Sequence, residues 1–142
     1  MVETLADIEA RCDAIEGCFE YNLAWAAKGV NGDEPGLSTA ELRHSLIGAV
    51  DAIQGLGQSF RAAIEQAGLK PAVRYTDFIE ILERDAKDAL VTIELVLAQP
   101  VISSQLIDNL NASVHLRALL TDLFLIDELI KTHTKASSAP TN

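Results

Sequence analysis

Four long segments of the chain repeat apolar residues every three or four positions, and this spacing constrains the fold more than any other feature. The segments cover residues 3–28, 38–68, 76–98 and 101–131. Residues spaced in this way lie on one face of a helix, and that face must be buried against another element. The period-two alternation that strands require does not occur in the sequence. The sequence therefore predicts an all-α protein.

Short stretches that contain glycine or proline separate the four segments. Four helices joined by short loops predict an antiparallel up-down four-helix bundle. The chain has 142 residues, which is the length of one domain. We assign residues 1–134 to a single helical-bundle domain. Residues 135–142 are mostly small and polar, and we expect them to form a flexible C-terminal tail.

The second segment has the clearest start signal. Ser38-Thr39-Ala40-Glu41 has the pattern of a capping box, in which the serine and the glutamate each bind a free backbone amide of the first helical turn. Leu37 and Leu42 are spaced to form a hydrophobic staple across it. We therefore expect a helix to begin at Ser38.

The acidic composition limits the classes of partner. The chain has 11 Lys and Arg against 21 Asp and Glu, a formal net charge of −10. Nucleic-acid binding requires a surface that neutralises phosphates, so we expect no DNA or RNA partner. The first residues are acidic where a secretory signal is basic, and four charged residues interrupt the longest apolar stretch, residues 116–130. We expect a cytoplasmic protein with no membrane partner.

The last predicted helix is apolar around nearly its whole circumference between residues 116 and 130. A helix that is apolar on more than one face must be covered on more than one face, and a second copy of the chain is a common cover. We therefore expect a homodimer whose contact uses Leu119, Leu123, Ile126 and Ile130. The alternative is that this helix lies centrally within one chain.

His44 stands out because it faces away from the predicted apolar side of its helix. At 100° per residue, His44 lies about 160° from Leu46 on a helical wheel. Small residues follow along the outer side, and a glycine inside a helix costs roughly 1 kcal/mol relative to alanine. Such residues are explained if a partner approaches the histidine closely. The expected docking residues are Gly48, Asp51, Gly55 and Ser59, with Ala62 beyond them.

An exposed imidazole suits one kind of chemistry in particular. Its unprotonated nitrogen can take a phosphoryl group from an aspartyl phosphate and pass it to another. The helix positions the nucleophile, and small neighbours allow a receiver protein to dock its acidic pocket over it. Little else is required from the protein that carries the histidine.

The residues around His44 resemble two related families. His44-Ser45-Leu46-Ile47-Gly48 is similar to the His-x-Leu-Lys-Gly motif of histidine-containing phosphotransfer domains, with Ile47 in place of the lysine. The run from His44 to Ile53 is also similar to the phosphoacceptor box of histidine-kinase dimerisation domains. The resemblance covers about a dozen residues. It implies that His44 is a phosphoacceptor and that the partner is a receiver-type domain. We expect Arg43, directly before the histidine, to assist the phosphoryl charge.

The sequence departs from the kinase pattern at two positions. Ser45 stands where kinase boxes carry an acidic residue, and Ala49 stands where they usually carry proline. No glycine-rich phosphate loop is present, and no ATP-binding domain fits in the remaining length. We therefore expect a phosphoryl carrier and not a kinase. The alternative is an adaptor, chaperone or immunity-type protein that acts through protein contacts alone, with His44 as an ordinary solvated residue.

Metal and redox sites lack a complete set of residues. Glu41-x-x-His44 is half of a di-iron pattern, and Glu80-x-x-Glu83 is half of a magnesium-binding carboxylate pattern, but the second half of each is missing. Cys12 and Cys18 lie about 120° apart on a helix, so they are expected to be free packing residues. We expect no metal site and no cofactor.

Overall fold

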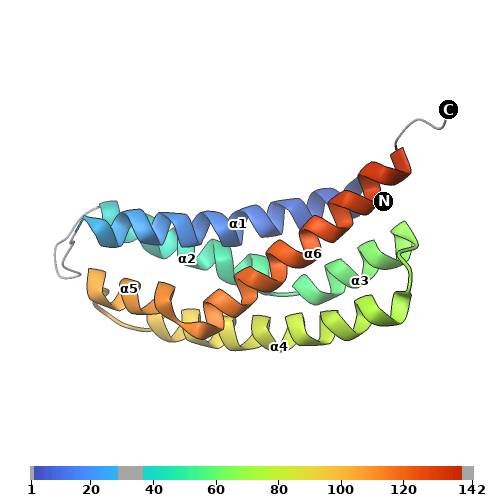
Figure 1. Ribbon diagram of the computed structural model, residues 1–142. Helices are drawn as coiled ribbons and strands as arrows, with labels where there is room; N and C mark the ends of the chain where they lie inside the picture. Colours follow the sequence, from blue (N-terminus) through green and yellow to red (C-terminus); the bar gives the residue numbers. More distant parts are fainter. Residues whose placement is uncertain (1, 29–36, 139–142) are drawn as a thin grey trace.

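The computed structural model describes the backbone of residues 2–28 and 37–138 and the side chains of residues 4–28 and 39–133. Within these ranges the chain forms six α-helices and no strand (Figure 1). The prediction of an all-α protein is therefore confirmed. The helices are α1 (Val2–Ala27), α2 (Leu37–Ile53), α3 (Leu56–Ala67), α4 (Ala72–Leu97), α5 (Ser104–Ala112) and α6 (Val114–Ser138).

The helices run back and forth along one long axis. In Figure 1, α1 runs from right to left, α2 and α3 return to the right, α4 runs to the left, and α5 and α6 return. The helix α1 packs against α2, α3 and α5, and α4 packs against α2, α3 and α6. Each helix therefore buries its apolar side against at least one neighbour.

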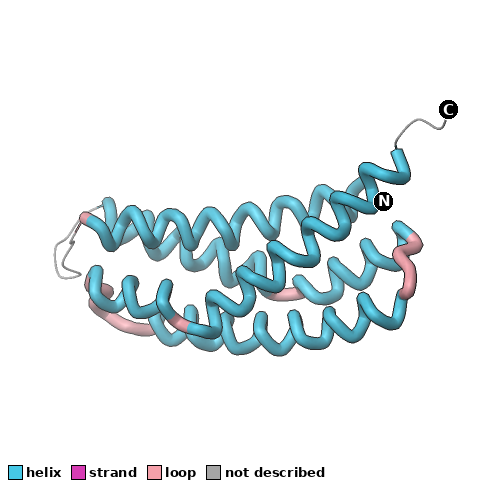
Figure 2. The backbone as a smooth tube through the Cα atoms, viewed as in Figure 1, coloured by secondary structure: helices cyan, strands magenta, loops and turns pink. Residues whose placement is uncertain are grey.

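The helix expected over residues 38–68 is interrupted after Ile53, so that part of the prediction is wrong. Gly55 has a φ of 78° and a ψ of 5°, a left-handed conformation that glycine adopts without steric cost. Arg11 of α1 donates to the carbonyl oxygens of Ala52 at 3.0 Å and Gln54 at 2.6 Å. These bonds satisfy carbonyl groups at the end of α2 that have no intrahelical partner. The break between α2 and α3 is visible as a loop in Figure 2.

The helix expected over residues 101–131 is also interrupted. Ser103 is the N-cap of α5, and its hydroxyl accepts the N–H of Leu106 at 3.1 Å. Ser113 then leaves the helical region with a ψ of 132°, and its hydroxyl accepts the N–H of His115 at 3.2 Å. The described chain thus has six helices where four were expected, because one glycine and one capping serine each divide a long segment.

Three predicted boundaries differ from the structure by a few residues. The helix α4 begins at Ala72 and not at residue 76, and α6 continues to Ser138, beyond the predicted helix end at residue 131. The helix α2 begins at Leu37, one residue before the predicted capping residue. The side chains of Leu37 and Ser38 lie outside the described residues, and so does the predicted capping box.

The core contains most of the apolar residues that the helical spacing identified, but Val114 and Phe124 of the last segment are 71% and 58% exposed. In the second segment, the buried residues from the predicted face are Leu42, Leu46, Ile53, Phe60 and Ile64. Cys12 and Cys18 are both buried and free, as expected. Burial is the main reason that the pKa of the Cys12 thiol is raised to about 12, so this thiol is protonated at neutral pH.

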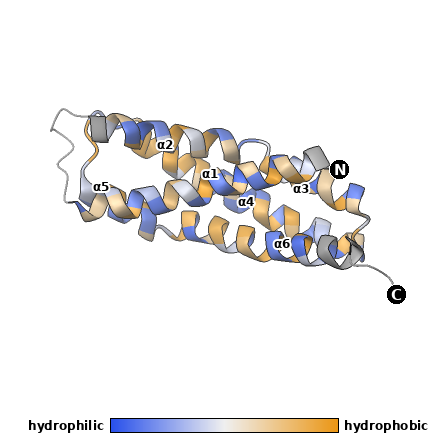
Figure 3. Ribbon diagram, turned by 90° about the horizontal axis from the view of Figure 1, so that it is seen from above, coloured by the Kyte–Doolittle hydropathy of each residue, from blue (hydrophilic) through white to orange (hydrophobic). Residues whose placement is uncertain are grey.

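The residues assigned to a dimer contact need correction. Leu119, Leu123, Ile126 and Ile130 are at most 2% exposed within a single chain, because α6 packs along α4 with this side inward. They cannot touch a second copy of the folded chain. Apolar residues recur along α6 as far as Ile130 (Figure 3), and those that remain exposed are Val114, Phe124, Leu125 and Leu129.

Candidate functional site

His44 lies on the outer side of α2. The helix buries Leu42, Leu46 and Ala49 on its inner side, and this orientation leaves His44 exposed. Within the described residues no ion pair involves the imidazole, and no side-chain hydrogen bond engages it. The ring nitrogens are therefore open to a ligand or a partner from solution.

Gly48 and Asp51 lie on the same exposed ridge as His44, one and two helical turns further on. A Cβ atom added to Gly48 would have no heavy atom within 4 Å apart from the local helix. Packing against the described residues therefore does not explain the glycine, although it lies in the interior of a helix. Gly48 leaves a low surface immediately beside His44.

Replacing Gly48 with alanine is expected to raise the free energy of unfolding by roughly 0.5–1 kcal/mol, since alanine has the higher helix propensity and meets no clash. Gly55→Ala is the control, and it is expected to lower the same quantity by about 1 kcal/mol because of the positive φ at that position. Urea denaturation of both variants measures the two effects. Destabilisation by Gly48→Ala would mean that another group packs against this glycine in the folded chain.

Arg43 is directed away from the ridge and towards the end of α4. Its guanidinium donates to the carbonyl oxygens of Leu97 at 3.0 Å, Gln99 at 2.7 Å and Pro100 at 3.3 Å. These carbonyls lie at and just beyond a helix C-terminus, where a cation is favoured. In this arrangement Arg43 ties α2 to α4, and three of its five N–H donors are bound by backbone oxygens.

The other two predicted docking residues do not share the ridge with His44. Gly55 lies at the break after α2, where it takes up the left-handed backbone conformation. Ser59 belongs to α3, and its hydroxyl donates to the Asp7 carboxylate of α1 at 2.7 Å. This bond is the largest cause of the lowered pKa of Asp7, which Arg11 lowers further. The expected continuous outer face is therefore divided at the helix break, and only Gly48 and Asp51 accompany the histidine.

Exposed apolar side chains also occur on α2 and α4, the helices that Arg43 joins. Ile47 of α2 is 49% exposed, and Val91 and Leu95, one turn apart on α4, are 62% and 64% exposed. Apolar residues of this size at helical spacing favour contact with another protein when they lie together. They leave apolar surface exposed on α2 and on α4.

One pair of carboxylates was missed by sequence reasoning. Asp122 of α6 is only 9% exposed, and its Oδ2 atom has no hydrogen-bond partner. Burial raises the pKa of Asp122 to about 7, and the neighbouring Asp85 carboxyl of α4 raises it in the same direction. The signal was available, since Asp122 follows Leu119 by three residues and therefore lies on the buried stripe of α6.

Neither a metal site nor a membrane span is evident in the described parts of the chain. No group of three or more His, Cys, Asp or Glu side chains there is placed to hold a metal ion. None of the described helices combines the length and the hydropathy needed to cross a membrane. Comparison with protein families, with curated proteins and with solved structures gives no match to the chain.

Proposed function

We propose that the chain is a phosphoryl carrier, in which His44 accepts a phosphoryl group from the aspartyl phosphate of a receiver-type partner. The observation that carries the proposal is the position of His44, exposed on the outer ridge of α2 with no side-chain partner in the described chain. A nucleophile that must reach into the pocket of another protein needs this kind of exposure. The short resemblance around His44 supports the same chemistry.

The transfer is a simple exchange of bonds. An unprotonated imidazole nitrogen attacks the phosphorus atom, a P–N bond forms, and the P–O bond to the aspartate breaks. The aspartate leaves as a carboxylate, and the reverse step transfers the group to a second receiver. Since Arg43 is bound to backbone carbonyls, the partner's own pocket supplies the positive charge that stabilises the phosphoryl oxygens.

The surroundings of His44 are compatible with docking of a partner. Gly48 leaves free space one turn from the imidazole, so the backbone of a partner can approach the helix closely. Ile47, beside it, offers apolar contact area. Asp51 adds a negative charge two turns from His44, which favours a partner with a basic group at the edge of its acidic pocket.

The proposal also covers the helix arrangement and the cellular compartment. We treat α2 with α3, and α5 with α6, as interrupted versions of single helices in an up-down four-helix bundle. The packing of α1 and α4 on both α2 and α3 supports this view. Phosphorylated receivers of signalling pathways occur in the cytoplasm, so a carrier that serves them belongs there too.

Intact mass after incubation with acetyl phosphate or a phosphorylated receiver tests the proposal. We expect a gain of one phosphoryl group that is lost in acid and is absent from His44→Gln. His115→Gln is the matched control, because His115 is also exposed but lies on α6, and it should be phosphorylated like the wild type. No gain with either donor, or an equal gain in His44→Gln, would refute the phosphoacceptor role.

The alternative function is protein binding without covalent chemistry. The exposed residues Val91 and Leu95 favour it, because neither contributes to the core. Under this alternative, capture of a protein partner survives His44→Ala and is lost in Val91→Ser/Leu95→Ser.

A homodimer would have to use the exposed side of α6, where Phe124 is 58% exposed. Sedimentation equilibrium of Phe124→Ser against the wild type tests that contact.

A further inference from the structure

A groove lies between the first turns of α4 and the middle of α6. Its volume is about 300 Å³, which is at the lower end of the range for small-molecule sites. The apolar residues that line it are Pro71, Tyr75, Phe78, Leu125, Ile126 and Leu129. Leu125 and Leu129, one helical turn apart, are 53% and 42% exposed, so an occupant would remove apolar surface from water.

Both charged residues that line the groove are cations. Lys70 and Arg74 lie at its α4 end, and neither forms an ion pair with a described residue, whereas Arg11, Arg61 and Lys131 do. No described acidic residue lines the groove, although the chain has a net charge of −10. The N-cap of α4 is Pro71, which has no side-chain cap bond, so the positive end of the helix dipole adds to the two charges.

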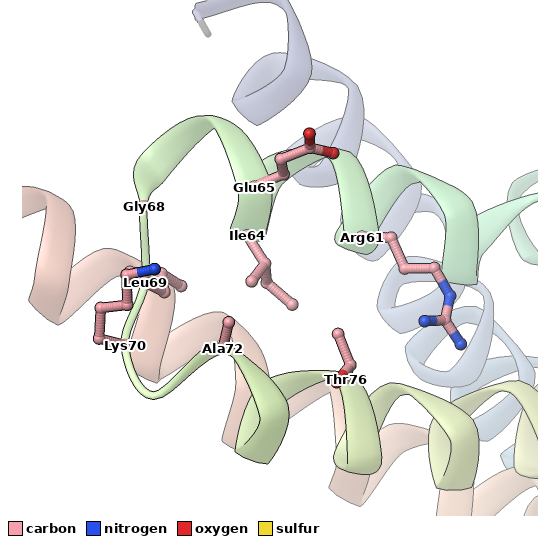
Figure 4. Close-up of a pocket in the computed structure, with 8 residues that line it drawn as sticks. All are labelled: Arg61, Ile64, Glu65, Gly68, Leu69, Lys70, Ala72 and Thr76. Carbon is pink, nitrogen blue, oxygen red and sulfur yellow. The ribbon is translucent and has the colours of Figure 1, made fainter.

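A neighbouring depression between α3 and α4 has a different charge balance. It shares Lys70, and Ile64 and Ala72 point into it from the two helices (Figure 4). Its other cation, Arg61, is bound to Glu83 at 2.7 Å, and Glu65 at its edge carries a negative charge. Of these two depressions, only the groove between α4 and α6 combines an apolar lining with uncompensated positive charge.

We propose that this groove binds a single-chain amphipathic carboxylate of medium length, of the kind represented by decanoate. The carboxylate lies at Lys70 and Arg74, and the alkyl chain lies along Phe78, Leu125 and Leu129. Charge-assisted hydrogen bonds favour a carboxylate between two such donors. Each buried methylene increases affinity about fourfold, and a volume of about 300 Å³ accommodates a medium-length chain better than a long one.

Isothermal titration calorimetry and amide chemical shifts of the full chain test the proposal, with ligands below their micelle concentrations. We expect saturable binding of decanoate, with shifts concentrated at the start of α4 and the middle of α6. Decanol, which has the same chain and no charge, should bind about tenfold more weakly, and decyltrimethylammonium more weakly still. Hexanoate lacks four of these methylenes and should therefore bind more than about a hundredfold more weakly.

Two double variants distinguish binding in the groove from a general effect of the net charge on ligand binding. Lys70→Gln/Arg74→Gln should weaken decanoate about tenfold and leave decanol unchanged. Arg84→Gln/Lys87→Gln makes the same change in charge on exposed positions of α4 outside the groove, and it should bind decanoate like the wild type. Because these positions are exposed, both variants are expected to fold, and thermal melting checks this.

Several results would overturn the proposal. They are an absence of saturable binding, equal affinity for the anionic and cationic ligands, equal effects of the two double variants, and shifts spread over the whole chain. A groove that is covered by a second copy, shown by a dimer that decanoate does not dissociate, would also overturn it. His44 does not line the groove, so these outcomes are independent of phosphoryl transfer.

Discussion

Raising the pH from about 5 to about 8 is expected to lower the free energy of unfolding by roughly 2–3 kcal/mol through Asp122 alone. Burial and the neighbouring Asp85 raise the pKa of this carboxyl from 3.8 to about 7 in the folded chain. At pH values between these two pKa values, the folded state holds a proton that the unfolded state has lost. Stability therefore falls as the pH rises through this window, and the fall levels off above a pH of about 7.

The position of the Asp122 carboxyl also predicts that the stability of the folded chain falls as the pH rises. Asp122 Oδ2 is buried without a donor, and a proton shared with Asp85 is the group that can satisfy it. Once both carboxylates are ionised, two like charges face each other between α4 and α6 in a site with little water. Burial also raises the pKa of Glu16, so a variant is needed to isolate the contribution of Asp122.

Asp122→Asn is expected to stabilise the chain by about 3 kcal/mol at pH 8 and to flatten the pH profile, because the amide has nearly the same shape, carries no charge and can donate to Asp85. Asp88→Asn on the exposed side of α4 is the matched control and should leave the slope of the wild type unchanged. Urea denaturation at several pH values between about 5 and 8 provides the comparison. A wild-type profile that is flat, or that rises with pH, would contradict the shared proton.

Helical spacing was sufficient to predict the helical class and most of the core, but not the number of helices. Leu46, Ile53 and Phe60 are buried as predicted, although a break lies between the last two. The break occupies only Gln54 and Gly55, so the apolar positions continue in register from α2 into α3. For this reason the pattern looked like one uninterrupted helix.

The breaks depend on information that periodicity does not contain. The end of α2 is held by Arg11, which is more than forty positions earlier in the chain. No local pattern reveals which carbonyls a distant guanidinium will bind. Ser103 and Ser113 were readable as caps, since serine is favoured at helix N-termini, but the apolar residues on both sides concealed them.

The candidate site was also predictable only where it depends on local sequence. The outward position of His44 follows from its place on the helical wheel, and the structure agrees. The hydrogen bonds of Arg43 to α4 and the left-handed backbone of Gly55 belong to the tertiary structure. Neither was predictable from the local sequence, because each depends on where another segment lies. The pairing of Asp85 with Asp122 is of the same kind: the sequence places Asp122 on the buried stripe of α6 but does not reveal which residue faces it.

A buried amide network joins α1 to α5, and its loss is expected to cost roughly 2–4 kcal/mol. The Asn22 side-chain amide donates to Asn111 Oδ1 at 3.1 Å, and the Asn111 amide donates to the carbonyl oxygen of Phe19 at 3.2 Å. Asn22 is 1% exposed and Asn111 is 6% exposed. Asn111→Ala would leave a buried donor of Asn22 without its partner and would open a cavity between the two helices.

The double-mutant cycle of Asn22→Leu and Asn111→Leu distinguishes hydrogen bonding from packing. Each single variant leaves one amide buried without its partner, whereas the double variant removes both amides together. The double variant is therefore expected to be less destabilised than the sum of the singles by about 1–2 kcal/mol. Asn109→Ala, an exposed position of the same helix, should change stability by less than about 0.5 kcal/mol. Additive single effects would mean that volume, and not the shared hydrogen bond, determines how α5 is held against α1.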